Sequence, residues 1–192
     1  MLKNTSKLTL NLRFLRFFII STILVSSPFF NKIQDAKAGL EFQWDQDDNF
    51  RRLKWFQKEN RRRFRNKIYF FFRPSDRKTD LLKINLAIPK TFKSTLKNEK
   101  ISFCKVRIGG FDTRTKCLED IPADIEINTD ESGLRSLDIY PYKPIPSNKD
   151  SYAIVLKVFN PKKSGLYQFH SYGQSKGKSF SSYLGSWTIV ID

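Results

Sequence analysis

Residues 124–140 read DIEINTDESGLRSLDIY, and the two ends of this stretch share one pattern. Near its start Ile125 and Ile127 alternate with polar residues, and near its end Leu137 and Ile139 do the same. Side chains of a β-strand point to opposite faces in turn, so this alternation predicts strands with one buried and one wet face. Strands of that kind are typical of antiparallel sheets.

Short runs of β-branched and aromatic residues occur along most of the chain after residue 67, bounded by Pro, Gly, Asn and Asp. The eight predicted strands cover residues 68–72, 81–88, 101–108, 124–128, 136–140, 152–159, 166–172 and 186–191. This number of short strands predicts an all-β fold, an antiparallel β-sandwich, over residues 66–192. Loosely helical spacing of apolar residues predicts one helix in residues 50–64.

The first 38 residues have the order of parts that is typical of a secretory signal. Four basic residues precede an apolar run at 17–25, and Ala36 and Ala38 supply the small side chains that signal peptidase requires. A helix that spans a bilayer needs about 20 apolar residues, and this run is shorter. We therefore expect a signal peptide (1–38) cleaved after Ala38, with retention as a membrane anchor as the alternative. The expected location is the periplasm or another extracytoplasmic compartment, the thylakoid lumen included.

Cys104 and Cys117 are the two cysteines of the chain. An even number in an exported protein predicts a disulfide, and Gly109-Gly110 between them allows a tight reversal. Closing a loop of this size stabilises a fold by roughly 3 kcal/mol in the chain-entropy account. Two reduced, buried cysteines are the alternative.

The net charge indicates the chemistry of the partners. Without the first 38 residues the chain keeps 29 basic and 18 acidic residues, a formal charge of +11. Such a charge favours anionic partners, and export would keep the protein from genomic DNA and RNA. The expected partners are an anionic envelope polymer, a membrane surface or an acidic protein, and no nucleic acid is expected.

The region 39–65 is acidic and aromatic as far as residue 50 and basic after it. Residues 61–67 read RRRFRNK and carry five cations. Arginine binds phosphate and carboxylate through paired hydrogen bonds, and aromatic side chains stack on sugars or bases. We therefore predict an anionic-partner surface that precedes the first strand. It comprises Arg61, Arg62, Arg63, Arg65, Lys67 and Trp55. The alternative is an ordinary solvated face, partly neutralised by the acidic stretch.

Four motifs of the second half follow one another in a recognisable order. They are a proline-rich turn at 140–146, an Asn160-Pro161 corner after a strand, a Gly-aromatic strand at 165–169 and a Leu-Gly turn at 183–187. In this order they resemble the cyanobacterial secreted family known as domain of unknown function 2808, over about residues 66–192. The resemblance implies an extracytoplasmic β-domain and brings no activity with it.

No catalytic, cofactor-binding or metal-binding residues are predicted. His170 stands in an alternating strand without a nearby nucleophile or carboxylate motif, so we expect it to face solvent. The preferred function is a non-catalytic binding or scaffolding domain at an anionic envelope surface or protein complex. The alternative is an enzyme that acts on an acidic cell-wall polysaccharide with a pair of carboxylates. The candidates for such a pair are Asp112, Glu119, Asp120 and Asp138.

Overall fold

The computed structural model describes residues 51–192, so the predicted signal peptide and its cleavage site lie outside the described residues. Ten strands and two short 3₁₀ turns make up this part of the chain. The strands are β1 (Trp55–Gln57), β2 (Arg65–Phe72), β3 (Leu81–Ile88), β4 (Ile101–Arg107), β5 (Lys116–Asp120), β6 (Ala123–Thr129), β7 (Arg135–Pro141), β8 (Tyr152–Phe159), β9 (Gly165–Ser175) and β10 (Ser182–Ile191). The 3₁₀ turns are η1 (Pro74–Asp76) and η2 (Asn98–Lys100).

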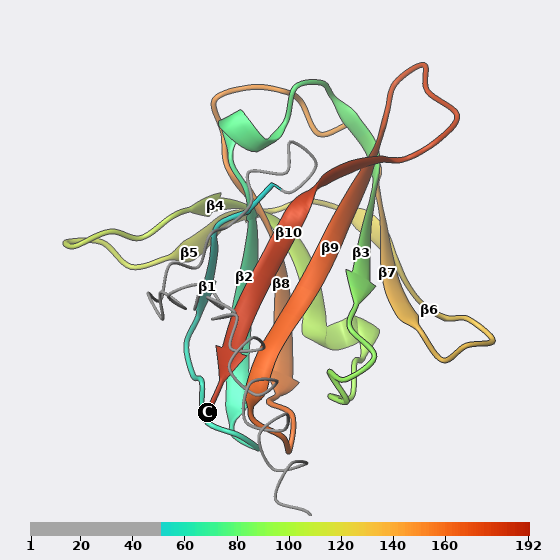
Figure 1. The fold of residues 1–192 in the computed structure, drawn as a ribbon. Coiled ribbons are helices and arrows are strands. Elements are labelled where there is room, and N and C mark those ends of the chain that lie inside the picture. The colour runs from blue at the N-terminus through green and yellow to red at the C-terminus, as the bar shows by residue number, and fades with distance from the viewer. Residues whose placement is uncertain (1–50) are drawn as a thin grey trace, which may run out of the picture. The chain divides into compact units, whose positions relative to one another are not determined.

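The strands form two five-stranded antiparallel sheets that pack as a sandwich (Figure 1). The first sheet has the order β1-β2-β8-β4-β5, and the second sheet has the order β10-β9-β3-β7-β6. The predicted all-β antiparallel sandwich is therefore confirmed. All eight predicted strands are present, and those at 81–88 and 152–159 keep their predicted bounds. The sequence did not indicate β1 or β5.

The prediction of a helix in residues 50–64 is wrong for the described part of that stretch, which contains β1. The backbone N–H of Leu53 donates to the carbonyl of Ser186 (2.8 Å), and the N–H of Ser186 donates to the carbonyl of Arg51 (2.7 Å). This stretch therefore lies along β10, and its long-range pairing overrides the loose helical spacing. Because β1 precedes the arginines and Arg65 opens β2, the expectation that the basic residues come before the first strand is also wrong.

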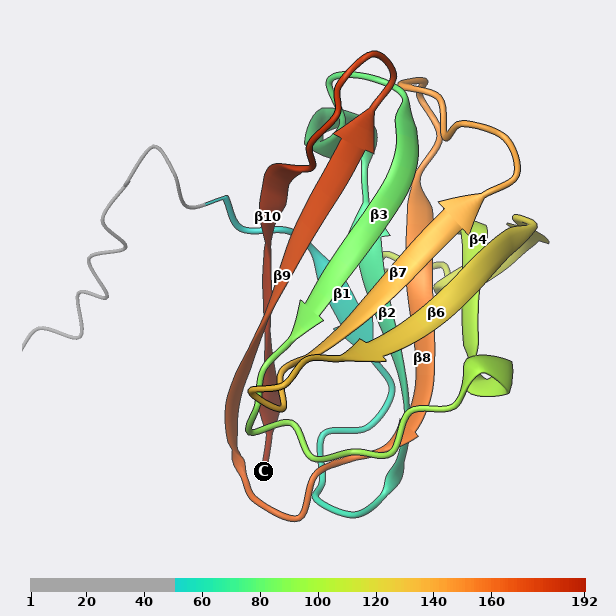
Figure 2. The ribbon, with the colours of Figure 1, turned by 90° about the vertical axis from the view of Figure 1, so that its right-hand side faces the viewer.

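The second sheet lies over the first as a separate layer (Figure 2). The inner faces of the two sheets enclose one hydrophobic core. Trp187 is at its aromatic centre, with the ring centroids of Phe70 and Phe72 at 4.9 and 5.2 Å. The ring of Phe169 lies 4.8 Å from that of Phe70. Burial of each large apolar side chain stabilises the fold by roughly 1.5–3 kcal/mol, so this cluster is a main source of stability.

A second, smaller apolar cluster lies on the outer face of the first sheet. Its buried members are Tyr69, Phe71, Cys104, Val106, Ala153 and Val155. Because β2 and β8 bury side chains on both faces, residues 68–72 and 152–156 form continuous apolar runs rather than alternating ones.

The predicted disulfide is confirmed: Cys104 of β4 is bonded to Cys117 of β5, with their Cα atoms 5.7 Å apart. The two strands form a hairpin whose reversal depends on Gly109. The N–H of Gly109 donates to the hydroxyl of Thr115 (2.9 Å), and a Cβ at this position would meet the carbonyl oxygen of Thr113 at 2.7 Å. The hairpin therefore requires glycine here, and the disulfide fixes its edge strand.

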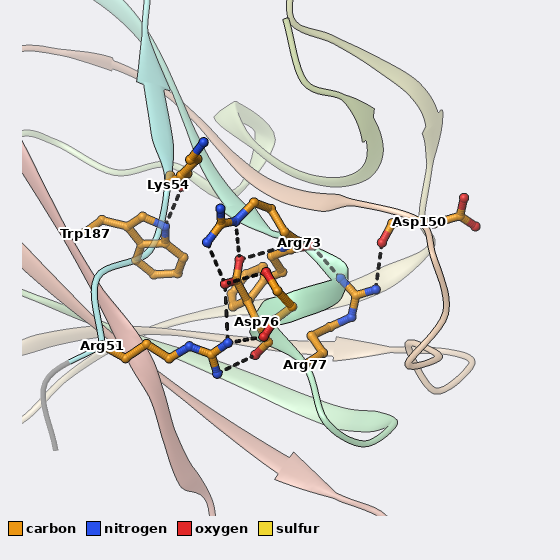
Figure 3. A network of polar contacts seen from close by, with 9 residues as sticks. Arg51, Lys54, Arg73, Asp76, Arg77, Asp150 and Trp187 are labelled. Carbon is orange, nitrogen blue, oxygen red and sulfur yellow. Dashed lines mark hydrogen bonds and ion pairs between the residues drawn. The ribbon is translucent and has the colours of Figure 1, made fainter. Parts of the chain in front are cut away.

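A polar network fastens the first described residues to the sandwich (Figure 3). The buried carboxylate of Asp76 accepts hydrogen bonds from the backbone N–H of Arg73 (2.8 Å) and from its guanidinium (3.0 Å). The guanidinium of Arg51 forms a further ion pair with it at 3.5 Å. The indole N–H of Trp187 donates to the carbonyl of Lys54 (3.0 Å).

No helix within residues 51–192 has the length and apolar character needed to cross a bilayer.

Candidate functional site

The turn between β1 and β2 carries most of the predicted anionic-partner residues, and Asn160 fixes its shape. The side-chain amide of Asn160 donates to the carbonyls of Glu59 (3.1 Å) and Arg61 (2.8 Å), and its backbone N–H donates to the carbonyl of Phe64 (2.9 Å). Within this turn Arg63 has a φ of 62°, a conformation that residues other than glycine adopt rarely. The buried side chain of Asn160 therefore stabilises a turn whose backbone conformation the residues of the turn do not themselves favour.

Arg61 is largely neutralised inside this turn. Its guanidinium donates two hydrogen bonds to the carboxylate of Glu59 (3.0 and 2.7 Å) and lies 4.1 Å from the ring centroid of Phe64. The hydrogen bonds from Arg61 hold the pKa of Glu59 at about 2, below its ordinary value of 4.5. Glu59 therefore stays ionised at neutral pH and offsets the charge of Arg61.

The other predicted residues occupy three different settings. Arg62 and Arg63 have exposed side chains at the tip of the turn. Lys67 is half-buried on β2, with its ammonium 4.9 Å from the ring centroid of Tyr69. Trp55 packs against the main core and borders a separate hollow with Arg52, Lys54 and Arg73. The cations of residues 61–67 are therefore spread over the turn and the start of β2, and Trp55 lies apart from them.

Arg65 lines a groove of about 380 Å³ beside this turn, which we call the basic groove. Its other charged lining residues are Lys97 and Lys100, from the stretch around η2, and Lys157 of β8. Its apolar lining comes from Val158 and Phe159 of β8, and Asn66 and Thr95 complete it. Four cations from three separate segments of the chain thus surround one groove with a partly apolar lining.

The sequence reasoning missed Lys97, Lys100 and Lys157. Lys157 occupies an outward-facing position of β8, and register places it directly opposite Lys67 of β2. A partial signal for Lys157 was present, because it interrupts an otherwise apolar strand, but its place beside the basic stretch follows only from the register of β2 and β8. Lys97 precedes η2 and Lys100 is its last residue, in a stretch without apolar periodicity, so nothing local indicated that they line a groove with residues of β2 and β8.

The charges of the groove are unbalanced. Like charges directly opposite each other on adjacent strands tend to destabilise a sheet, and Lys157 of the groove lies directly opposite Lys67. Within residues 51–192, none of the groove cations forms an ion pair, although Arg73, Lys83 and Lys105 each pair with an aspartate. Glu99 lies between Lys97 and Lys100 in sequence and is exposed without an ion pair. The groove can therefore hold an anion with several charged contacts.

The carboxylates considered for catalysis do not form a shared site around Asp138. This residue lies on β7 of the second sheet, where it accepts from Lys83 (3.2 Å), Asn85 (2.7 Å) and Asn128 (3.0 Å). Its neighbours in sequence face the core, so its own side chain lies on the outer face. The other candidates belong to β5 of the first sheet and to the hairpin before it, and they are Asp112, Glu119 and Asp120.

His170 lies on the outer face of the second sheet, out of phase with the core residues Tyr167 and Phe169, and it is half-buried there. Its Nδ1 lies 2.7 Å from the hydroxyl of Ser186, which lies 2.6 Å from the hydroxyl of Tyr183. This cluster could not be predicted from the sequence, because its members are on different strands or flank the register shift between Tyr183 and Gly185. Ser186 is fully buried, so this hydroxyl does not reach solvent as a nucleophile would.

Among residues 51–192, one group of His, Cys, Asp or Glu side chains has a spacing that suits a metal ion: Cys104, Cys117 and Asp120. Both cysteines are in the disulfide and offer no thiolate. These residues therefore do not fit a metal site.

Fold and groove together define an all-β sandwich domain with a cationic groove at one end of its strands. The chain belongs to the family described as Protein of unknown function (DUF2808), whose model matches residues 42–191. This confirms the family resemblance drawn from residues 66–192 and extends the match to β1 and the basic turn. The comparison with curated proteins gives no match.

Several solved structures are similar to this chain in fold. BslA, a bacterial hydrophobin, has 13% identity and a TM-score of 0.45, over 73% of this chain and 97% of that one. The collagen-binding domain of a Staphylococcus aureus adhesin has 13% identity and a TM-score of 0.37, over 71% of this chain and 95% of that one. ACE19, the collagen-binding subdomain of an Enterococcus faecalis surface protein, has 12% identity and a TM-score of 0.38, over 71% of this chain and 95% of that one. At this identity the likeness concerns the fold alone.

Proposed function

We propose that this domain is a non-catalytic binding domain that holds an anionic partner at the cell envelope through the basic groove. The partner classes are an anionic envelope polymer, a membrane surface or an acidic protein. Arg62, Arg63 and Lys67 add to the field around the groove, whereas Glu59 offsets Arg61.

One observation carries this proposal: Arg65, Lys97, Lys100 and Lys157 converge on one groove without an ion pair among the described residues. Bringing like charges together costs free energy unless an opposite charge joins them. An anionic partner would supply that charge and would form charge-assisted hydrogen bonds, the stronger kind.

The compartment is part of the proposal. We infer export from the order of basic, apolar and small residues in the first 38 positions. The Cys104–Cys117 disulfide supports it, because disulfides persist mainly in oxidising compartments. The envelope of a cyanobacterium, with the periplasm or thylakoid lumen as the space, fits the family resemblance.

Binding of the full-length protein to heparin, used as a generic polyanion, tests the proposal. The variant Lys100→Ser/Lys157→Ser should lose about tenfold or more in affinity, since a charge-assisted contact contributes about 1.5 kcal/mol. The affinity of the unmodified protein should fall steeply with added salt. The matched control is Lys176→Ser/Lys178→Ser, which removes the same charge from the turn after β9, at the other end of the strands. Equal loss in both variants would mean that net charge, not the groove, attracts polyanions.

A further inference from the structure

The basic groove lies among exposed aromatic side chains. Phe159, which lines it, is 56% exposed, and Phe64 in the adjacent turn is 49% exposed. Each ring has a guanidinium group near its face: Arg65 lies 5.4 Å from the ring centroid of Phe159, and Arg61 lies 4.1 Å from that of Phe64. Apolar rings and cations are therefore interleaved at this end of the sandwich.

The neutral polar groups of the groove are few. The side-chain oxygen of Asn66 accepts from the backbone N–H of Glu59 (3.1 Å), and its amide donates to Asn160 (2.9 Å). This amide is buried and engaged, which leaves Thr95 as the remaining neutral polar side chain of the lining. A polysaccharide needs many neutral donors and acceptors for its hydroxyl groups, and an apolar lining would leave those hydroxyls unpaired.

A lipid headgroup matches these features better. Its phosphate is the anion that Arg and Lys bind, and its glycerol and acyl region matches the exposed ring of Phe159. Peripheral proteins bind membranes by this combination, in which basic residues meet anionic headgroups and Phe or Leu enters the acyl boundary.

We infer that the occupant of the groove is an anionic phospholipid in a bilayer, with Phe64 and Phe159 entering the interface. This inference rests on the proposed function and names its partner. The buried hydrogen bonds of Asn160 hold the turn of Phe64 beside the groove, so both rings are presented by a fixed backbone. A rigid turn loses little conformational entropy on docking.

An environment-sensitive dye on a single introduced cysteine tests insertion in the full-length chain, because both native cysteines are in the disulfide. The dye is placed in Phe64→Cys or, as a control, in Phe180→Cys. Phe180 is 65% exposed and lies in the β9–β10 turn, at the other end of the strands. With vesicles of phosphatidylcholine and phosphatidylglycerol, the emission at position 64 should shift to the blue. With phosphatidylcholine alone, or with the dye at position 180, it should stay unchanged.

Affinity provides the second measurement. Phe64→Ser should weaken binding to the phosphatidylglycerol vesicles about tenfold, since burial of a phenylalanine ring is worth about 1.5 kcal/mol or more. It should leave heparin binding within about twofold because Phe64 does not line the groove, whereas Phe180→Ser should change neither. An unshifted dye at position 64, or unchanged vesicle affinity in Phe64→Ser, overturns the lipid inference. If the lipid inference fails but the unmodified protein still binds heparin, the proposed function stands. The proposed function is tested separately, by the loss of heparin affinity in the Lys100→Ser/Lys157→Ser variant.

Discussion

The side-chain amide of Asn66 donates a hydrogen bond of 2.9 Å to the side-chain oxygen of Asn160, and both residues are buried. This bond joins the start of β2 to the corner after β8 and orients the amide of Asn160 towards the carbonyls of Glu59 and Arg61. The Asn-Pro corner of the sequence therefore has a structural role: it fixes the turn that carries the exposed arginines.

Replacement of Asn160 should release that turn. Asn160→Ala leaves the carbonyls of Glu59 and Arg61 without their donors, and we expect a loss of about 1–3 kcal/mol in the free energy of unfolding. Asn160→Asp should cost at least as much, because a carboxylate would face two carbonyl oxygens. Denaturant unfolding measures both variants, and heparin affinity should fall with them as the turn loses its shape. Full stability of Asn160→Ala would show that the turn holds without this amide.

Glu59 limits the charge of the turn, so its removal should strengthen binding. Glu59→Gln keeps an oxygen that can accept from the backbone N–H groups of Asn60 and Arg61 but removes the negative charge. We expect heparin affinity to rise by roughly threefold to fivefold, as one more cation becomes available. Glu131→Gln is the control, since this exposed residue lies in the β6–β7 turn. A similar rise in both variants would assign the effect to net charge.

The pH dependence of the Glu59–Arg61 pair has a defined sign. The folded pKa of Glu59, about 2, lies below its ordinary value of 4.5, so the contribution of the pair to stability is present above about pH 4.5. It is lost as the pH falls through about 2. On this account heparin affinity should not change between pH 5 and 8, and a titration of affinity across that range checks it. A rise in affinity towards pH 5 would mean that Glu59 is protonated there.

The sequence predicted the parts of the fold in which local pattern and tertiary structure agree. Strands such as β6 and β7 bury one face, so their alternation was visible, and the cysteine count predicted the disulfide. The strand β5 was missed because Lys116–Asp120 is exposed along most of its length and has no apolar period. The strand β1 has three residues and takes its conformation from pairing with β2.

The same reasoning explains what was predicted of the site. A local run of arginines was readable, so the cations of residues 61–67 were identified. The groove depends on the register of β2 against β8 and on the approach of the stretch around η2, which are long-range features. The stacking of Arg61 on Phe64 and its pairing with Glu59 were equally invisible, because a charge count does not distinguish a paired cation from a free one.

The disulfide should hold the β4–β5 hairpin on the first sheet. Cys104→Ala/Cys117→Ala should lower the free energy of unfolding by about 3 kcal/mol, as expected for a closed loop of this size. Loosening of the hairpin should also expose the second apolar cluster, which includes Tyr69 and Phe71. Thermal unfolding measures the first effect and binding of the dye ANS measures the second. Unchanged ANS binding in the variant would show that β5 stays in place without the bond.

Lys157 provides the sharpest test, because stability and binding should change in opposite directions. Lys157→Glu replaces a like-charge pair with Lys67 by an opposite-charge pair across β2 and β8. We expect the free energy of unfolding to rise by about 0.5–1 kcal/mol, the usual size of a cross-strand charge effect. The same change places a carboxylate in the basic groove, so affinity for heparin and for phosphatidylglycerol vesicles should fall by well over tenfold.

Two controls separate these effects. Lys176→Glu makes the same change in net charge in the turn after β9, where no lysine is paired across strands, so it should alter neither stability nor affinity by a comparable amount. Lys157→Gln removes the repulsion without adding an attraction, and its stability should lie between the unmodified protein and Lys157→Glu. If Lys157 lowers the stability of the fold, its presence is explained by a role in binding, since residues that serve function often cost stability. If Lys157→Glu is less stable than the unmodified protein, Lys67 and Lys157 do not repel each other measurably. The positive charge of the groove is then offset more than its lining residues indicate.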